Sequence, residues 1–184
     1  MTLNREEQLE LIRIAREAIM ANNGTGIKQS VPLYSSEKFH ICCGTFVSIY
    51  VEGDLRGCIG TFSEEQSLYQ NIKEMAVSAA TSDSRFKPLV PAELAHIQIE
   101  ISVLSPRIRI YDKSEIIIGK HGIFMRKGMN RGTLLPQVAV NQNWSVEELL
   151  GNCAKYKAGI GWDGWKSAEL FTYEAHIFSS KNHS

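Results

Sequence analysis

The segment from Ile97 to Val103 restricts the fold of this sequence more than any other. Apolar residues at 97, 99, 101 and 103 alternate with polar residues at 96, 98, 100 and 102. Successive side chains of a β-strand point to opposite faces, so this alternation predicts a strand with one buried and one exposed face. Such strands are typical of antiparallel sheets that are covered on one side.

Helices are predicted on both sides of this strand. Three residue pairs have the spacing of a helix start: Asn4 with Glu7, Ser63 with Gln66, and Ser145 with Glu148. Apolar residues then recur at helical intervals after each pair. The first helix is expected to end at Asn22–Gly24, and the polar segment 25–38 predicts a loop.

Further strands are predicted from β-branched and alternating segments. Residues 45–51 form one, which turns at Gly53–Asp54 into the next segment as a hairpin. Short strands are expected at 116–118 and 123–125, and a closing strand at 171–177. Because strands and helices follow in an irregular order, we predict an α+β fold with a largely antiparallel sheet flanked by helices.

The composition limits the class of protein. With 184 residues, 43% of them hydrophobic, residues 1–184 suffice for a single globular domain with a small second lobe. The net charge of +0 provides no global field that would attract nucleic acid or membrane. The polar N-terminus does not resemble a secretory signal, and the sequence contains no apolar run of membrane-spanning length.

The cysteines and histidines do not form a metal-binding pattern. None of the four cysteines belongs to a Cys-x-x-Cys pair, which indicates reduced thiols in a cytoplasmic protein rather than a disulfide framework or a zinc ribbon. The histidines show no ligand spacing. We therefore expect no metal and no cofactor.

The hexapeptide Leu55–Gly60 combines one thiol, one permanent cation and two glycines. In a regular strand Leu55 and Ile59 would face the core, whereas Arg56 and Cys58 would share the opposite face. This grouping of reactive and charged side chains suggests a functional site.

Cys58 is the first candidate for chemistry. A thiolate is the reactive form of cysteine, and a cation such as Arg56 nearby favours it. Alternatively, Cys58 is a small packing residue, because cysteine is among the most buried residue types. Gly57 and Gly60 lack a Cβ, so backbone or substrate can approach closely there, and we include both as substrate-binding candidates.

Other candidates lie further along the chain. His121 stands before a glycine and could act as a general base or orient the thiol; alternatively it is a turn histidine bonded to backbone. Asp83, Arg85 and Glu93 could clamp an anionic substrate, with Arg85 as a bidentate donor. Alternatively, these charges form a salt-bridge network that pins a loop.

Basic residues are concentrated between positions 107 and 131, where only Asp112 and Glu115 oppose them. They are Arg107, Arg109, Lys113, Lys120, Arg126, Lys127 and Arg131. Such a surface could meet RNA or a phosphorylated ligand. Alternatively, it is the solvated face of a hairpin, since no aromatic residues are seen to interleave with the charges.

Several of these stretches together resemble one family, the AMMECR domain family, which is also called protein A of the AmmeMemoRadiSam gene system. The matching blocks between about Gly44 and Phe178 are Leu55–Phe62, Asp83–Phe86, Pro88–Leu89, Glu93–Leu94, Gly119–Gly122, and Leu134–Ala139 with Trp144. Lys87 and Asn141 depart from the pattern, since proline and glutamate are expected there.

The resemblance implies an α+β fold of two lobes, with the hallmark Leu55–Phe62 near a cleft between them. The gene context of the family implies a Memo-like protein and a radical S-adenosylmethionine (SAM) protein as partners. Our leading hypothesis is a cytoplasmic enzyme, or enzyme component, with its site around Arg56 and Cys58, which modifies RNA or an anionic small molecule. The alternative is a non-catalytic adaptor that binds a Memo-like or radical SAM partner, or RNA.

Overall fold

The computed structural model describes residues 2–23 and 36–180 of the chain. The chain divides into two compact units, Met1–Leu104 with His176–Ser184, and Ser105–Ala175. Each unit has its own four-stranded sheet and its own apolar core, and the paired strands run antiparallel in both sheets. The α+β class predicted from the sequence is confirmed; the cleft between two lobes stays a prediction.

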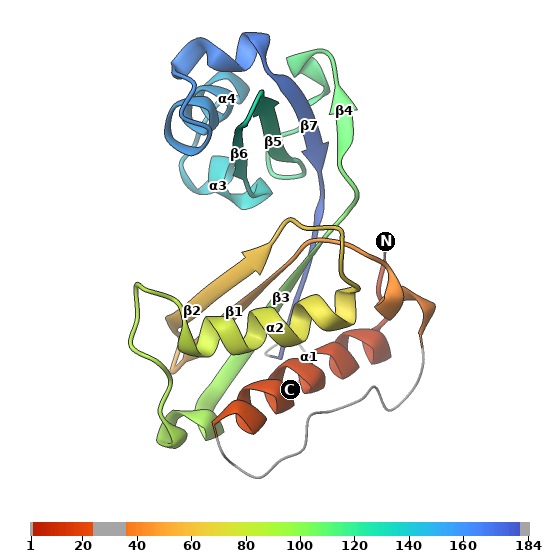
Figure 1. Ribbon diagram of the computed structural model, residues 1–184, viewed down its shortest axis with the longest axis vertical. Coiled ribbons are helices and arrows are strands. Elements are labelled where there is room, and N and C mark those ends of the chain that lie inside the picture. Colours follow the sequence, from red (N-terminus) through yellow and green to blue (C-terminus); the bar gives the residue numbers. More distant parts are fainter. Residues whose placement is uncertain (1, 24–35, 181–184) are drawn as a thin grey trace. The chain divides into compact units, whose positions relative to one another are not determined.

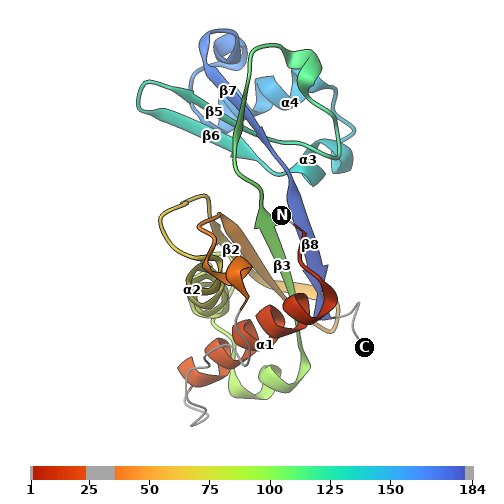
Figure 2. The same cartoon turned by 90° about the vertical axis from the view of Figure 1, so that its right-hand side faces the viewer.

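The sheet of the first unit has the strand order β2-β1-β3-β8. Its strands are β1 (Thr45–Val51), β2 (Asp54–Thr61), β3 (Ile97–Leu104) and β8 (Ala175–Ser179). The long helices α1 (Arg5–Asn22) and α2 (Leu68–Thr81) lie side by side on one face of the sheet, as Figures 1 and 2 show. Short 3-10 helices flank them: η1 (Glu37–His40) and η2 (Pro91–His96).

The alternation in β3 is confirmed from Ile97 to Ile101 and ends there, because Ser102, which was predicted on the polar face, is only 7% exposed. Ile97, Ile99 and Ile101 are at most 2% exposed and pack in the core with both helices, whereas Gln98 and Glu100 are partly buried on the other face. The apolar half of this strand therefore holds the sheet against the helices, as the hydrophobic effect requires.

The hairpin between β1 and β2 turns at Glu52 and Gly53, whose φ angles of 54° and 95° are both positive. Two-residue hairpin turns favour this left-handed conformation, which glycine adopts without strain. The pairing then slips by one residue, because Tyr50 pairs with Leu55 whereas Ile49 pairs with Gly57. Arg56 is therefore the extra residue of a β-bulge.

This bulge overturns the predicted alternation of the hexapeptide. Directly paired residues have their side chains on the same face, so Leu55 shares the face of Tyr50, away from the core. Ile59 does pack against the core, as predicted. Sequence periodicity alone could not locate the bulge, because the slip is defined by the partner strand.

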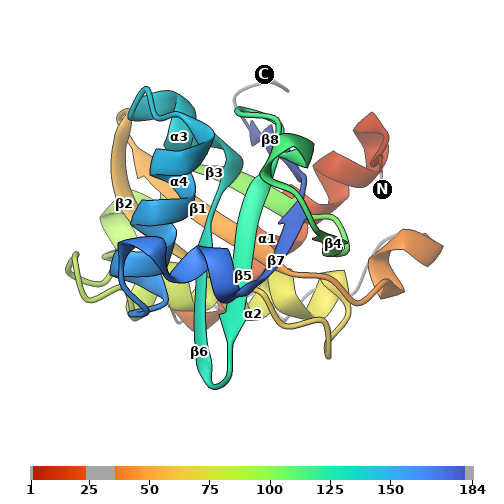
Figure 3. The same ribbon diagram turned by 90° about the horizontal axis from the view of Figure 1, so that it is seen from above.

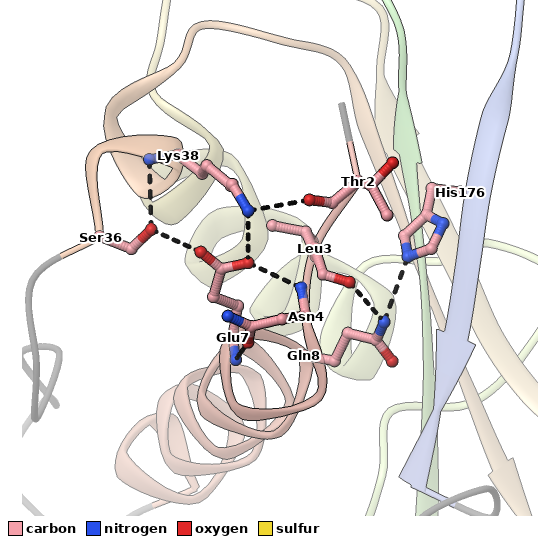
Figure 4. A network of polar contacts seen from close by, with 8 residues as sticks. All are labelled: Thr2, Leu3, Asn4, Glu7, Gln8, Ser36, Lys38 and His176. Atoms are coloured by element: carbon pink, nitrogen blue, oxygen red, sulfur yellow. Dashed lines mark hydrogen bonds and ion pairs between the residues drawn. The ribbon is translucent and has the colours of Figure 1, made fainter.

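The first turn of α1 is fixed by a network around the buried Glu7 (Figure 4). Its carboxylate accepts hydrogen bonds from the Asn4 backbone N–H at 2.7 Å, the Ser36 hydroxyl at 2.8 Å and the Lys38 ammonium at 2.9 Å. The Asn4 side chain in turn accepts from the Glu7 N–H at 2.8 Å, which completes the predicted capping box. The carboxylate thus ties the helix start to η1.

The second unit has the strand order β4-β7-β5-β6. Its strands are β4 (Ile108–Ile110), β5 (Gly122–Lys127), β6 (Asn130–Leu134) and β7 (Glu169–Tyr173). Its helices are η3 (Lys113–Glu115), α3 (Pro136–Asn141), α4 (Val146–Asn152), the π-helical turn η4 (Cys153–Lys157) and η5 (Trp162–Ser167). Figure 3 shows α3 and α4 on the same side of β5 and β6, where Met125, Leu149 and Leu150 form the core.

Three sequence predictions need correction. The α2 helix starts at Ser67 with Gln70 as its capping box, not at Ser63 with Gln66. Residues 116–118 are not a strand. The alternating segment 171–177 is not one strand, since it breaks between β7 and β8, which belong to different sheets. The predicted loop 25–38 lies mostly outside the described residues.

A substitution at Glu7 tests the network at the start of α1. Burial raises the pKa of Glu7, but the hydrogen bonds from Lys38, Asn4 and Ser36 together outweigh burial and hold the pKa below its ordinary value. The stabilisation is therefore present above the unfolded-state pKa of about 4.3 and is lost as the pH falls through the folded-state value. We expect Glu7→Gln to lower the free energy of unfolding at neutral pH by about 1–3 kcal/mol.

The difference between wild type and Glu7→Gln should shrink as the pH falls below about 4, because protonation removes the same charge. Urea unfolding at several pH values measures this. The exposed Glu6 of the same helical turn provides the control variant Glu6→Gln, which should change stability by less than about 0.5 kcal/mol. Equal losses for both variants would contradict the assignment.

Candidate functional site

Polar side chains cross the first sheet in a row on the face opposite α1 and α2. Cys58 on β2 pairs with Ser48 on β1, and Ser48 pairs with Glu100 on β3. Paired residues place their side chains on the same face, so the thiol, the hydroxyl and the carboxylate lie next to one another. Tyr50, two residues along β1, points to this face as well. All four residues are partly buried.

One hydrogen bond joins two of these four side chains, since the Ser48 Oγ lies 3.2 Å from the Cys58 Sγ and donates to it. Because hydroxyl and thiol hydrogens can rotate, the same contact also permits donation from the thiol to Ser48. Burial and the charge of Glu100 raise the pKa of Tyr50. Burial also raises the pKa of Glu100, although the neighbouring Tyr50 hydroxyl opposes this.

The backbone of Cys58 is held from the open edge of the sheet. β2 is the edge strand, so a row of its N–H and C=O groups has no strand partner. The Cys58 N–H donates to the Asp83 carboxylate at 2.8 Å, and its carbonyl accepts from the Arg85 guanidinium at 3.1 Å. Asp83 and Arg85 thus provide hydrogen-bond partners for the two edge groups of Cys58.

The Asp83 carboxylate is buried and fully engaged. It accepts from the Arg85 backbone N–H at 3.1 Å and from the Arg85 guanidinium at 2.7 and 2.9 Å, in addition to Cys58. The guanidinium bonds hold its pKa well below the ordinary range, against the effect of burial. This pattern supports the alternative that these charges pin a loop.

Arg85 is the cation bound to Cys58, through the backbone carbonyl of that residue. Its own pKa is raised chiefly by its hydrogen bonds to Asp83. Its side chain is 57% exposed, so part of the guanidinium faces solvent. Arg85 can therefore bind the strand backbone and a ligand at the same time.

Arg56 is engaged elsewhere. Its Nε and Nη2 donate to both oxygens of Glu93, at 2.8 and 3.1 Å, and its Nη1 donates to the Lys87 carbonyl at 3.3 Å. The Glu93 carboxylate also accepts the Val90 N–H at 2.9 Å, and its pKa is lowered chiefly by Arg56. This bidentate pair joins the bulge to the segment around η2, again as the loop-pinning alternative expects.

Both glycines of the hexapeptide are closely covered by their own chain. A Cβ on Gly57 would lie 2.0 Å from the Ala79 carbonyl oxygen, so this position lets α2 approach β2. A Cβ on Gly60 would lie 2.2 Å from the Phe46 ring. The close approach predicted at these glycines thus involves a helix backbone and an aromatic ring.

His121 belongs to the second unit, whereas every other predicted site residue belongs to the first. The ring Nδ1 of His121 accepts the Ile117 backbone N–H at 3.2 Å, and the backbone N–H of His121 donates to the Ile117 carbonyl at 2.9 Å. His121 is thus bonded to the backbone of its own turn, as the structural alternative proposed.

A small hollow adjoins the row of polar side chains. It has a volume of about 140 Å³ and is lined by Tyr50, Gly53, Gln98, Ile99, Glu100 and Ser179. Among residues 2–23 and 36–180, no three or more His, Cys, Asp or Glu side chains are grouped so that they could hold a metal ion. Within the same residues, no helix is long and apolar enough to cross a membrane.

Ser48, Tyr50 and Glu100 were missed by sequence reasoning. The alternation in 97–103 already placed Glu100 on the polar face of its strand, whereas 45–51 was predicted as a strand without assigned faces. Their connection to Cys58 depends on the register between three strands, which periodicity does not provide.

A substitution at Asp83 tests its hold on the strand edge. Asp83→Asn removes the charge that Arg85 neutralises and weakens the acceptor of the Cys58 N–H, so the free energy of unfolding should fall by about 1–3 kcal/mol at neutral pH. Because the folded-state pKa is depressed, this stabilisation exists above the unfolded-state pKa of about 3.9 and disappears as the pH falls. Thermal unfolding across pH measures it.

The control for Asp83 is Asp163→Asn, since the Asp163 side chain is 70% exposed and also pairs with a cation, Lys166. It should shift stability by less than about 0.5 kcal/mol. If Asp83→Asn changes the free energy of unfolding as little as Asp163→Asn does, the hydrogen bonds of Asp83 to Cys58 and Arg85 do not stabilise the fold.

Comparisons with known proteins agree with the family suggested by the sequence. The sequence model of the AMMECR1 family matches residues 12–178. Protein MK0488 of Methanopyrus kandleri is 37% identical, over 97% of this chain and 91% of that protein. A protein of Methanothermobacter thermautotrophicus is 36% identical, over 96% and 95%.

A solved structure has the same fold. The crystal structure of the uncharacterized protein PH0010 from Pyrococcus horikoshii matches with a TM-score of 0.84 and 30% identity, over 96% of this chain and 93% of that one. The chain therefore belongs to the AMMECR1 family.

Proposed function

We propose that this protein is a thiol-dependent cytoplasmic enzyme, or a component of one, that uses Cys58 to modify RNA or an anionic small molecule. The observation that carries the proposal is the environment of the sulfur. A partly buried thiol lies 3.2 Å from the Ser48 hydroxyl, and the Arg85 guanidinium donates to the backbone carbonyl of the same cysteine at 3.1 Å. Thiols that act as nucleophiles occupy such electropositive, partly accessible surroundings.

The row of hydroxyls provides a route for the thiol proton. The proton would pass from Cys58 to Ser48, from Ser48 to Tyr50, and from Tyr50 to the carboxylate of Glu100. Glu100 is suited to accept it, because burial raises its pKa above the ordinary value. The thiolate then forms a bond from sulfur to an electrophilic carbon of the substrate, while the bond from that carbon to its leaving group breaks. The leaving group departs with the electron pair and takes up the proton held by Glu100, which is nucleophilic catalysis.

Arg85 would act on both the thiolate and the substrate in this step. Its bonds to Asp83 fix the guanidinium at the backbone of Cys58, from where its charge would stabilise a thiolate. The solvent-facing part can donate to a phosphate or carboxylate of the substrate. In the proposed reaction Arg56 has a supporting role, because its bidentate bond to Glu93 fixes the bulge beside Cys58.

The second candidate function is that of a non-catalytic adaptor. The charges of Arg56, Glu93 and Asp83 are satisfied inside the protein, which suits a rigid docking surface as well as an enzyme. In this case a Memo-like or a radical SAM protein binds the first unit. Cys58→Ala should then leave the affinity for either partner unchanged within about threefold, since one side chain away from a hot spot contributes little.

Co-purification and titration of the chain with each partner at micromolar concentration tests the adaptor function. Cys58→Ala is compared with Glu74→Gln, an exposed position on α2. If neither partner binds the wild-type chain, the adaptor function is wrong.

Alkylation rates test the thiol directly. In a Cys42→Ser background, which removes the exposed thiol, Cys58 should react with iodoacetamide at neutral pH much faster than Cys43 and Cys153. Burial raises the pKa of Cys43 to about 11 and that of Cys153 to about 12, so these thiols stay protonated. Mass spectrometry of each cysteine peptide over time gives the rates.

Variants separate the proton route from simple exposure. Glu100→Gln and Ser48→Ala should each slow alkylation of Cys58 about tenfold, because proton removal through positioned groups is lost. The control variant Glu74→Gln should not change the rate. The catalytic role of the thiol would be refuted if Cys58 is alkylated as slowly as Cys153, or if neither Glu100→Gln nor Ser48→Ala changes its alkylation rate.

A further inference from the structure

Two phenyl rings lie together on the face of the second sheet opposite its helices. Phe124 on β5 pairs with Phe171 on β7, and the ring centroids are 5.8 Å apart at an interplanar angle of 62°. The neighbouring residues Ile123, Met125 and Leu170 are in the apolar core, so strand alternation directs both rings to the other face. β7 and β5 are the two central strands of this sheet.

Arginine side chains surround the rings. The Arg107 guanidinium lies 4.5 Å from the centroid of Phe124, and the Arg126 guanidinium 5.9 Å from that of Phe171. Arg109 on β4 pairs directly with Phe171, and Arg131 on β6 pairs directly with Arg126. The sheet thus supplies flat rings in its centre and guanidinium groups on both sides of them.

The charge on this face is positive. Glu169 is the carboxylate among these side chains, and it accepts from Arg126 at 2.8 Å and lies 3.1 Å from Arg109. The two arginine side chains remain 45% and 47% exposed. Arg126 and Arg131 also face each other across the strands, an arrangement that costs stability unless an anion lies between them.

The basic residues of 107–131 were recognised from the sequence, but the statement that no aromatic residues interleave with them was wrong, since Phe124 stands between Lys120 and Arg126. Phe171 could not be found in this way, because it is far from the segment in the chain. The register of β5 with β7 supplies the second ring, and that of β4 with β7 places Arg109 beside it. The basic segment is therefore not only the solvated face of a hairpin.

The end of this face near Tyr173 is not accessible to a ligand, because the tyrosine is buried. Tyr173 is 2% exposed, and its hydroxyl bonds to the Thr133 hydroxyl and the Leu134 carbonyl, both at 3.0 Å. Its ring lies against Gly122, where a Cβ would be 2.4 Å away. The surface available for a ligand accordingly runs from the two phenyl rings toward Arg126 and Arg131.

We propose that this face, formed by Phe124, Phe171 and the arginines 107, 109, 126 and 131, binds single-stranded nucleic acid. Unpaired bases stack on aromatic rings and guanidinium planes, while their phosphates require cations along the strand. An acidic peptide would use the arginines but not the rings. A duplex hides its base faces, so its phosphates alone could be bound. The proposal does not rest on the thiol of Cys58.

Fluorescence anisotropy with a labelled oligouridine of about 12 nucleotides tests the proposal, and the matching oligothymidine shows whether the sugar matters. Binding should weaken steeply with salt. Arg131→Gln should lower the affinity at low salt and reduce the slope of log K against log salt by about 0.7, the value for one lost contact to a single strand.

Phe171→Leu removes the stacking surface but keeps an apolar side chain. It should weaken binding about fivefold or more without changing the salt slope, which separates stacking from charge. Circular dichroism and thermal unfolding confirm that the variant is folded; if it is not, Phe124→Leu serves the same purpose. The matched control is Lys155→Gln, since Lys155 also lies over an aromatic ring, Tyr156 at 4.9 Å, but in the helical layer.

Several outcomes would overturn the proposal. One is the absence of binding at about 50 mM salt and micromolar protein, where even non-specific complexes form. Others are duplex binding as tight as single-strand binding, equal competition by polyglutamate, or a loss in Lys155→Gln as large as that in Arg131→Gln. Each of these results leaves the proposal for Cys58 unaffected, because the variants lie in the other unit.

Discussion

The buried carboxylate of Asp83 is the contact on which the candidate site depends. It accepts the backbone N–H of Cys58 on the edge strand and holds the guanidinium of Arg85, which returns to the Cys58 carbonyl. An unpaired strand edge is open to association with other chains, and this pair of side chains covers it. The same contact positions a cation at the backbone of Cys58, so edge protection and the surroundings of Cys58 arise together.

Several features defined by local sequence were predictable. The capping box of Asn4 with Glu7 and the turn after Val51 are present, and the alternation of 97–103 holds as far as Ile101. The capping box of α2 was placed at Ser63 instead of Ser67, because both serines are followed three residues later by glutamine. Features that depend on which strands pair with one another were not predictable. The segment 171–177 alternates without interruption, yet it serves two sheets in turn, and nothing in its pattern marks the change at Glu174.

The candidate site also contains residues that the local sequence identified and residues that only the strand pairing brings together. The hallmark motif identified Cys58, and the separate motif around Asp83 identified Arg85, but the sequence could not show that Arg85 rather than Arg56 binds Cys58, through its backbone carbonyl. The hydroxyl of Ser48 and the carboxylate of Glu100 are cross-strand neighbours of the thiol. Their role depends on a register that a slip of one residue would reverse, because the side-chain period of a strand is two.

The bulge at Arg56 changes the direction of a charged side chain within the hallmark. In a regular strand Arg56 would share the open face with Cys58, because Gly57 lies on the helix face against the Ala79 carbonyl. As the extra residue of the bulge, Arg56 has no partner position on β1, and its guanidinium bonds to Glu93 and Lys87 instead. The slip also moves Leu55 to the open face with Cys58, so one inserted residue determines which side chains surround the thiol.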